Sequence, residues 1–192
     1  MKEGLGVHDF VEQHKVINIA IAIIIAILAF IAPVAIIYPA KSSFITPQAE
    51  EIGTSAWALL TGGIGLLALA GVFLTLAVTD KKLKKWLIVA VLSIAACIGL
   101  SFSIKDYYYM TPDHFALNEP FSYTTLIYEW DDFESVEEFI TKIDGTTAVE
   151  KVVLHMKDGS DYSYDGGVMM RMYSTIISRV ESAGGEYSRT KY

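Results

Sequence analysis

Residues 16–40 read VINIAIAIIIAILAFIAPVAIIYPA, and this run decides the fold because it contains no Asp, Glu, Lys, Arg or His. As a helix rising about 1.5 Å per residue it would be about 37 Å long, more than the roughly 30 Å hydrocarbon core of a bilayer. Residues 56–78 and 86–104 form two further runs of this kind, about 34 and 28 Å long as helices. Lipid offers the backbone no hydrogen-bond partner, so each run is expected to be helical throughout. The sequence therefore predicts three transmembrane helices.

The first run is expected to stay in the chain. The apolar part of a secretory signal spans about 7–15 residues before a small-residue cleavage site. This run is longer, and Ala32-Pro33-Val34-Ala35 places a proline where cleavage sites usually avoid it. Because proline lacks the backbone N–H of a regular helix, we predict an uncleaved first helix with a kink at Pro33.

Lysines are distributed unevenly over the short segments that flank these runs. One side carries Lys2, Lys15, Lys81, Lys82, Lys84 and Lys85, and the other carries Lys41 and Lys105. An excess of lysine marks the cytoplasmic side of a membrane protein. Residues 1–15 are therefore predicted to be a cytoplasmic tail. Three crossings would then place residues 105–192 on the outer side of the plasma membrane.

The predicted helices lack the residues of a translocation path. A charge at mid-bilayer costs about 3 kcal/mol, and pores or proton relays contain one conspicuously, whereas these runs contain none. They contain small residues, which let helix backbones approach closely, and the set is Gly62, Gly63, Gly65, Gly71, Ala22 and Ala26. Two interpretations stay open: packing within a three-helix bundle, or contact with a second membrane subunit or another copy of the chain.

The charge differs between the two halves of the chain. Hydrophobic residues make up 53% and charged residues 19%, against about 25% charged in a soluble domain. Residues 106–192 hold 16 Asp and Glu against 7 Lys and Arg, whereas the preceding 105 residues hold 6 against 8. A nucleic-acid-binding domain needs a basic patch, which this acidic region does not offer. The single cysteine, Cys97, excludes an internal disulfide and a multi-cysteine metal site.

Residues 105–185 are predicted to form a small extracytoplasmic α+β domain, an antiparallel sheet with two helices in the order β-β-β-α-β-β-α. The expected strands are 106–110, 114–117, 121–130, 150–156 and 161–164. Asp158-Gly159 indicates the last hairpin turn, because a type I′ turn needs positive φ at both central positions. Asp165 would cap a final helix whose apolar face contains Val168, Met172, Ile176 and Val180. Residues 186–192 are expected to be a loose tail.

The first helix of this domain is predicted from spacing. Phe133, Val136, Ile140 and Ile143 recur at helical intervals, and Gly145 offers an exit. Five carboxylates would cap it or lie on it: Asp131, Asp132, Glu134, Glu137 and Glu138. They could bind Ca²⁺, which takes six to eight oxygen ligands, although the EF-hand spacing is absent. The alternative is a solvated helix face whose acids interact favourably with the helix dipole.

Motifs of catalysis and cofactor binding are missing from the sequence. It contains neither Gly-x-Ser-x-Gly nor Gly-x-x-x-x-Gly-Lys. His8 and His14 lie six residues apart with Asp9 and Glu12 between them, a separation that would not place both rings on one face of a helix. His114 and His155 have no Cys or Glu at ligand spacing beside them. We therefore predict a non-enzymatic protein with no cofactor and no metal.

One stretch of the second half resembles a known group of proteins. Tyr128-Glu129-Trp130-Asp131-Asp132, the hairpin around Asp158-Gly159 and an apolar C-terminal helix are similar to small multi-pass membrane proteins of Gram-positive bacteria. Some of those carry a pleckstrin-homology-like domain after their transmembrane helices. The resemblance implies seven strands and commonly a cytoplasmic location, whereas the residue pattern gives five strands and the lysines place the domain outside. It implies no catalytic residues.

Together these features predict an integral membrane protein of the bacterial envelope. Its helices would anchor it in the lipid bilayer, and its acidic domain would contact another membrane-associated protein. An accessory or channel-forming subunit of a transporter, and a sensor of cations or lipid, remain alternative hypotheses.

Overall fold

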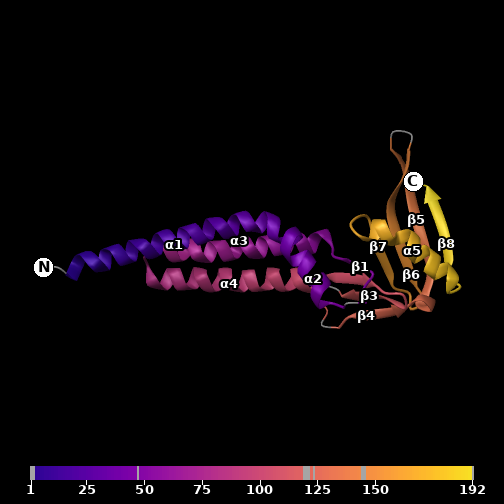
Figure 1. Cartoon of the computed structure of the whole chain (residues 1–192), viewed down its shortest axis with the longest axis horizontal. Helices are drawn as coiled ribbons and strands as arrows, with labels where there is room; N and C mark the ends of the chain where they lie inside the picture. Colours follow the sequence, from indigo (N-terminus) through magenta and orange to yellow (C-terminus); the bar gives the residue numbers. More distant parts are fainter. Residues whose placement is uncertain (1–2, 47, 119–121, 123, 144–145, 192) are drawn as a thin grey trace. The chain divides into compact units, whose positions relative to one another are not determined.

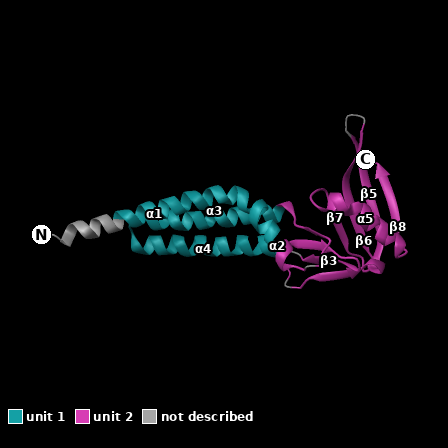
Figure 2. Ribbon diagram, in the orientation of Figure 1, with its two compact units in different colours: residues 1–41, 57–105 teal, residues 42–56, 106–192 magenta. Residues whose placement is uncertain are grey.

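The computed structural model of the chain describes residues 3–46, 48–118, 122, 124–143 and 146–191, with side chains from residue 12 onward except at 143. The chain divides into two compact units (Figure 2). The first comprises residues 1–41 and 57–105, and the second comprises residues 42–56 and 106–192.

The first unit is made of helices (Figure 1), and residues 42–44 and 56 at the ends of two of them belong to the second unit. The helices are α1 (Glu3–Ala32), the π-helical segment η1 (Pro33–Ile37), α2 (Tyr38–Phe44), α3 (Ala56–Val78) and α4 (Lys82–Lys105). Three continuous stretches, Glu12–Phe44, Ala56–Val78 and Lys82–Lys105, are long and apolar enough to cross a membrane. This confirms the prediction of three long apolar helices followed by a small domain with antiparallel strands.

The kink predicted at Pro33 takes the form of a widened turn. Tyr38 donates its backbone N–H to the carbonyl of Pro33, which is a π-helical bond. Proline has no N–H to offer the carbonyl of Ala29. The helix therefore passes this point by one wide turn and then continues as α2.

Side-chain size in the first unit is distributed as expected for a protein dissolved in lipid. Most buried positions are small, as at Ala22, Ala58 and Ala96, while Phe30 and Ile64 are exposed. Lipid tails are as apolar as leucine, so helices in lipid associate through close backbone packing and not by hiding large apolar side chains. This distribution agrees with a bilayer as the solvent.

The second unit contains two four-stranded sheets and a helix. The first sheet has the order β1-β2-β3-β4 and is antiparallel throughout; its strands are Glu51–Gly53, Tyr107–Met110, His114–Asn118 and Leu126–Glu129. The second has the order β7-β6-β5-β8, with strands Asp161–Tyr164, Thr146–Met156, Phe133–Ile143 and Glu186–Lys191. In it β8 runs parallel to β5, and the other pairs are antiparallel. The helix α5 (Met169–Ser182) lies against this second sheet (Figure 1).

The core of the second unit lies between α5 and the sheets. The predicted apolar face of α5 is confirmed, with Val168, Met172, Ile176 and Val180 all buried. The predicted cap by Asp165 is wrong: the N-cap residue is Val168, and no side chain caps it. A residue of strand β2 accepts a hydrogen bond from the first turn instead, because the backbone N–H of Met169 donates to the Tyr108 hydroxyl at 3.1 Å.

The helix predicted from residue 133 onward is wrong, because these residues form β5. Val136, Glu138 and Ile140 are buried in alternation, as in a strand, and a register shift between Phe133 and Ser135 brings Phe133 inward too. Because the charged Glu138 occupies an inward position, the sequence does not show the apolar–polar alternation that is typical of a strand. The apolar residues that remained were spaced as in a helix.

Other boundaries also differ from the prediction. The loose tail is strand β8, which pairs with β5. The strand predicted at 121–130 begins at Leu126, ends at Glu129 and is followed by the 3₁₀ segment η2 (Trp130–Asp132). Residues 119–121 and 123 lie outside the described residues. The predicted exit glycine at 145 also lies outside them. The order β-β-β-α-β-β-α and its five strands are therefore replaced by two sheets.

The Asp158-Gly159 hairpin is confirmed, with a different turn. Gly159 donates to the Met156 carbonyl and has φ +87°, and Met156 donates to the Ser160 carbonyl. This is a three-residue loop that ends in a left-handed glycine, not a two-residue type I′ turn.

Candidate functional site

Glycines form the contact between α3 and α4. A Cβ atom built on Gly65 would lie 2.9 Å from the backbone nitrogen of Leu100, and one on Gly99 would lie 2.8 Å from the carbonyl oxygen of Thr61. Both distances are shorter than Cβ atoms tolerate, so the two backbones meet because these positions have no side chain.

The other small residues predicted to pack helices are glycines of α3 that contact α1 and α4, and two alanines of α1. A Cβ on Gly63 would lie 2.9 Å from the Ala29 carbonyl, the one that Pro33 leaves without its helical donor. Ala22 is buried, and Ala26 is half-buried. Gly71 has a looser contact, 3.1 Å from its Cβ position to Leu92 Cδ1. The glycines thus contact neighbouring helices of the same chain, which favours packing within one bundle.

Ser103 of α4 is the polar residue buried deepest in the first unit. Its side chain is fully buried, and its hydroxyl has no hydrogen-bond partner within the described part of the chain. A Cβ on Gly62 would lie 2.5 Å from this hydroxyl oxygen. Ser103 therefore fills the space left by Gly62, and no room for a ligand remains between them.

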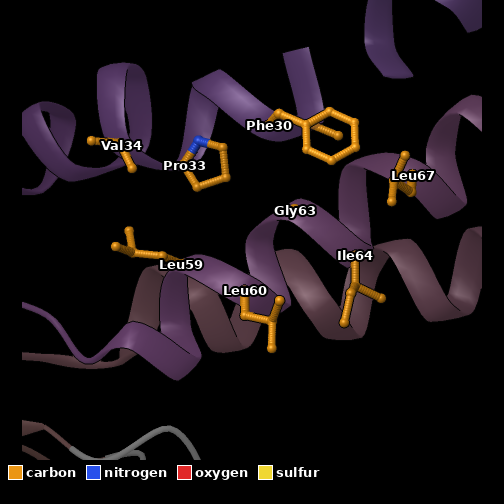
Figure 3. Close-up of a pocket in the computed structure, with 9 residues that line it drawn as sticks. Phe30, Pro33, Val34, Leu59, Leu60, Gly63, Ile64 and Leu67 are labelled. Atoms are coloured by element: carbon orange, nitrogen blue, oxygen red, sulfur yellow. The ribbon is translucent and has the colours of Figure 1, made fainter. Parts of the chain in front are cut away.

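An apolar groove of about 230 Å³ lies between α1 and α3 (Figure 3). Phe30 and Pro33 form one wall, and Leu60, Gly63 and Ile64 form the other. The lining offers no charged group and almost no polar surface. Such a groove suits a lipid chain and supplies no chemistry.

Five of the six lysines assigned to the cytoplasmic side lie at one end of the first unit, and the sixth, Lys2, lies outside the described residues. Lys15 of α1 lies 3.8 Å from Asp80, in the segment that joins α3 to α4. Lys85 donates to the carbonyl of Leu76 in the last turn of α3, at 2.8 Å. Lys81, Lys82 and Lys84 are exposed. The N-terminal flank and the α3–α4 loop therefore share an end, as the lysine count assumed.

The five carboxylates of the suggested cation cluster are separated by the strand geometry. Asp132 accepts the Glu129 N–H at 2.9 Å and forms a capping box with it. Glu137 and Glu138 are adjacent in β5 and so point to opposite faces of the sheet. Among the described residues no group of three or more His, Cys, Asp or Glu is placed to hold a metal ion. The alternative, a solvated helix face, is wrong because the predicted helix is strand β5.

Glu138 is a buried carboxylate, 1% exposed, that holds β8. Its Oε2 accepts hydrogen bonds from the Tyr187 hydroxyl and from Arg189, whose Nε and Nη2 lie 2.9 Å away. Burial, together with the Glu138 charge, raises the pKa of the Tyr187 phenol. The hydrogen bond to Glu138 likewise raises the pKa of Arg189. The sequence signal that could have revealed this group is the two-residue alternation of inward positions in β5, if Glu138 is counted as one of them.

The opposite face of this sheet carries a row of polar contacts. His155 Nδ1 lies 2.7 Å from Asp161 Oδ1, and its Nε2 lies 3.7 Å from Glu137 Oε2. Thr190 donates to Glu137 at 2.6 Å. The row therefore connects all four strands. Both ring nitrogens of His155 face carboxylates, so the arrangement orients the side chains of the sheet and presents no nucleophile.

Arg179 of α5 joins the helix to the first sheet. Its guanidinium lies 5.1 Å from the centre of the Trp130 ring, pairs with Glu50 at 2.7 Å and donates to the Thr111 carbonyl. The indole nitrogen of Trp130 donates to the Pro112 carbonyl at 2.8 Å. These contacts fix Trp130 and the turn between β2 and β3 in one place.

A surface hollow of about 450 Å³ adjoins this joint, at the edge strand β4. Ile127 of β4 is 58% exposed and lines it beside the rings of His114 and Trp130. Asp113, Glu129 and Asp131 complete the lining, together with Pro112, and all three acids are exposed. Nearby positive charge is engaged, since Lys157 donates to the Asp131 carbonyl and Arg179 pairs with Glu50. We call this feature the acidic hollow.

Comparison with protein-family models, with curated proteins and with solved structures gives no match for the chain. The acidic hollow was not predicted as a unit from the sequence. Its parts come from the β2–β3 turn, β4 and η2, and their proximity depends on strand pairing between residues 114 and 129. The aromatic-acidic sequence at residues 128–132 was the available signal.

Proposed function

We propose that this protein is a non-enzymatic, membrane-anchored interaction subunit of the bacterial envelope, and that its acidic second unit binds another protein outside the plasma membrane. One observation carries the proposal: the acidic hollow places an exposed isoleucine among carboxylates at an open sheet edge. An exposed edge strand is a ready template for pairing with another chain. Apolar residues ringed by polar ones are typical of protein contact sites.

The first unit supports anchoring over transport. Its glycines are occupied by backbone contacts within the bundle, and its three spans carry no charged side chain at their centres. The lysine-rich end corresponds to the cytoplasmic side in this proposal, which leaves the second unit outside. A channel-forming role would require polar groups that line a path, and the apolar groove provides none.

The resemblance to pleckstrin-homology-like domains remains part of the proposal. It is carried by residues 128–132 and the Asp158-Gly159 hairpin of the sequence. Lipid recognition by the acidic hollow is disfavoured, because Asp113, Glu129 and Asp131 would repel anionic headgroups. A protein partner suits this charge better.

The proposal is tested by the native mass of the protein. The full chain is solubilised from membranes with a mild detergent, after brief crosslinking in cells, and its mass is compared with 21.2 kDa plus the micelle. We expect a discrete larger complex that contains a second polypeptide. A chain that stays strictly monomeric, crosslinked or not, contradicts the proposal.

A further inference from the structure

The backbone of β4 offers hydrogen-bonding groups at the sheet edge. Thr111 donates to the His114 carbonyl, so His114 directs its backbone toward β2. The backbone N–H and C=O groups of successive residues in an antiparallel strand point to opposite sides. Those of Phe115 therefore point to β4 and form backbone hydrogen bonds with its partner Tyr128. Ile127, the neighbour of Tyr128, therefore directs its N–H and C=O away from β3. These are the groups that an added strand would use.

The acidic hollow lies beside this edge and specifies charge. Its three carboxylates belong to a unit in which residues 42–56 and 106–192 hold 18 Asp and Glu against 7 Lys and Arg. Complementary charge selects partners and speeds their encounter, and juxtaposed like charges exclude wrong ones. A second copy of this acidic unit is disfavoured for that reason.

We infer that β4 and the acidic hollow bind an extended, lysine- or arginine-rich segment of a partner protein, which adds as a strand at Ile127 and places an aliphatic side chain in the hollow. This inference rests on the proposed function and names its partner class. Backbone pairing to Ile127 would supply affinity, while Asp113, Glu129 and Asp131 would select the basic side chains.

The test measures peptide binding to the full chain in phosphatidylcholine nanodiscs, whose lipid headgroups carry no net charge, and empty nanodiscs are the blank. The probe is a fluorescein-labelled Lys-Val-Lys-Val-Lys-Val-Lys peptide, and its control replaces each Lys with Glu. Fluorescence anisotropy should show saturable binding of the basic peptide alone, with affinity that falls as salt rises.

Two variants locate the site. Ile127→Pro removes the outward N–H and spares the bonds to β3, and Asp113→Asn with Asp131→Asn removes two charges whose side chains make no described hydrogen bond. Each should weaken binding at least about tenfold. The matched charge control, Glu150→Gln with Glu181→Gln, neutralises two exposed acids elsewhere and should bind as the unaltered chain does. Ile127→Ala, which keeps the N–H, should bind better than Ile127→Pro.

Three results would overturn the inference: equal binding of both peptides, binding that the Asp113 and Asp131 changes leave intact, or self-association that Ile127→Pro abolishes, which would assign the edge to a second copy. A crosslinked complex that persists in both variants would refute this site and leave the proposed function standing. Loss of every complex from the unaltered chain would refute the proposed function itself.

Discussion

Glu138 shows how one charged residue specifies the arrangement of a strand. A buried carboxylate is costly unless hydrogen bonds satisfy it, and β8 supplies them through Tyr187 and Arg189. The parallel β8 strand therefore reaches β5 with a fixed register, Glu138 opposite Arg189. An apolar side chain at this position would also be buried, but it would not favour Arg189 as the residue opposite.

Replacing Glu138 with Gln keeps the shape and removes the charge. We expect a loss of about 1–2 kcal/mol in the free energy of unfolding, because charge-assisted bonds become neutral ones. Faster hydrogen exchange should be confined mainly to residues 186–191. Glu134→Gln, an exposed change on the same strand, should stay within about 0.5 kcal/mol. Equal effects of the two variants would contradict this role for Glu138.

We expect the second unit to lose stability in alkali through Tyr187. Burial raises its pKa in the folded chain above the value of about 10 for the unfolded chain. The stabilisation is therefore complete below pH 10 and is lost as the pH rises through the folded pKa. Between pH 9 and 11 the melting temperature of the unaltered chain should fall more steeply than that of Tyr187→Phe. The melting temperatures are measured by circular dichroism. If they fall equally steeply with pH in the unaltered chain and in Tyr187→Phe, Tyr187 is not the group responsible.

Among the elements, the apolar helices could be predicted and the strands only partly. Charge-free length alone identified α3 and the apolar part of α1, because lipid permits no other backbone structure there. β5 was missed because Glu138 interrupts its alternation. β8 was missed because Glu186–Lys191 is polar and mostly exposed, and its pairing with β5 depends on contacts about fifty residues apart in sequence.

The α3–α4 contact makes a specific prediction about glycine. Gly65→Ala places a methyl group 2.9 Å from a backbone nitrogen of α4, which cannot yield without moving the helix. We expect a loss of about 1–3 kcal/mol, typical of an overpacked core, measured by thermal unfolding in detergent. Gly71→Ala meets only the flexible end of Leu92 and should cost less. Equal stability of the two variants would show that α3 and α4 do not pack through Gly65.

At the scale of the whole molecule, composition predicted a division that the structure reproduces in outline. The apolar residues form one compact unit and the acidic residues the other, with residues 42–56 joining the second unit through β1. The membership of residues 42–56 in the second unit could not be predicted. The α1–α3 connection has no strand pattern, and β1 spans only three residues. The acidic hollow could not be predicted either, because its residues come together only through the pairing of β3 with β4.

Sidedness is the most direct test of the account. In a Cys97→Ser background, one variant carries Gly166→Cys, where a Cβ meets nothing within 4 Å, and the other carries Leu83→Cys, 86% exposed beside the lysines. Intact cells are treated with a membrane-impermeant maleimide. We expect labelling of Gly166→Cys in intact cells, and labelling of Leu83→Cys only after permeabilisation. The reverse pattern would place the acidic unit in the cytoplasm and contradict the proposed partner site.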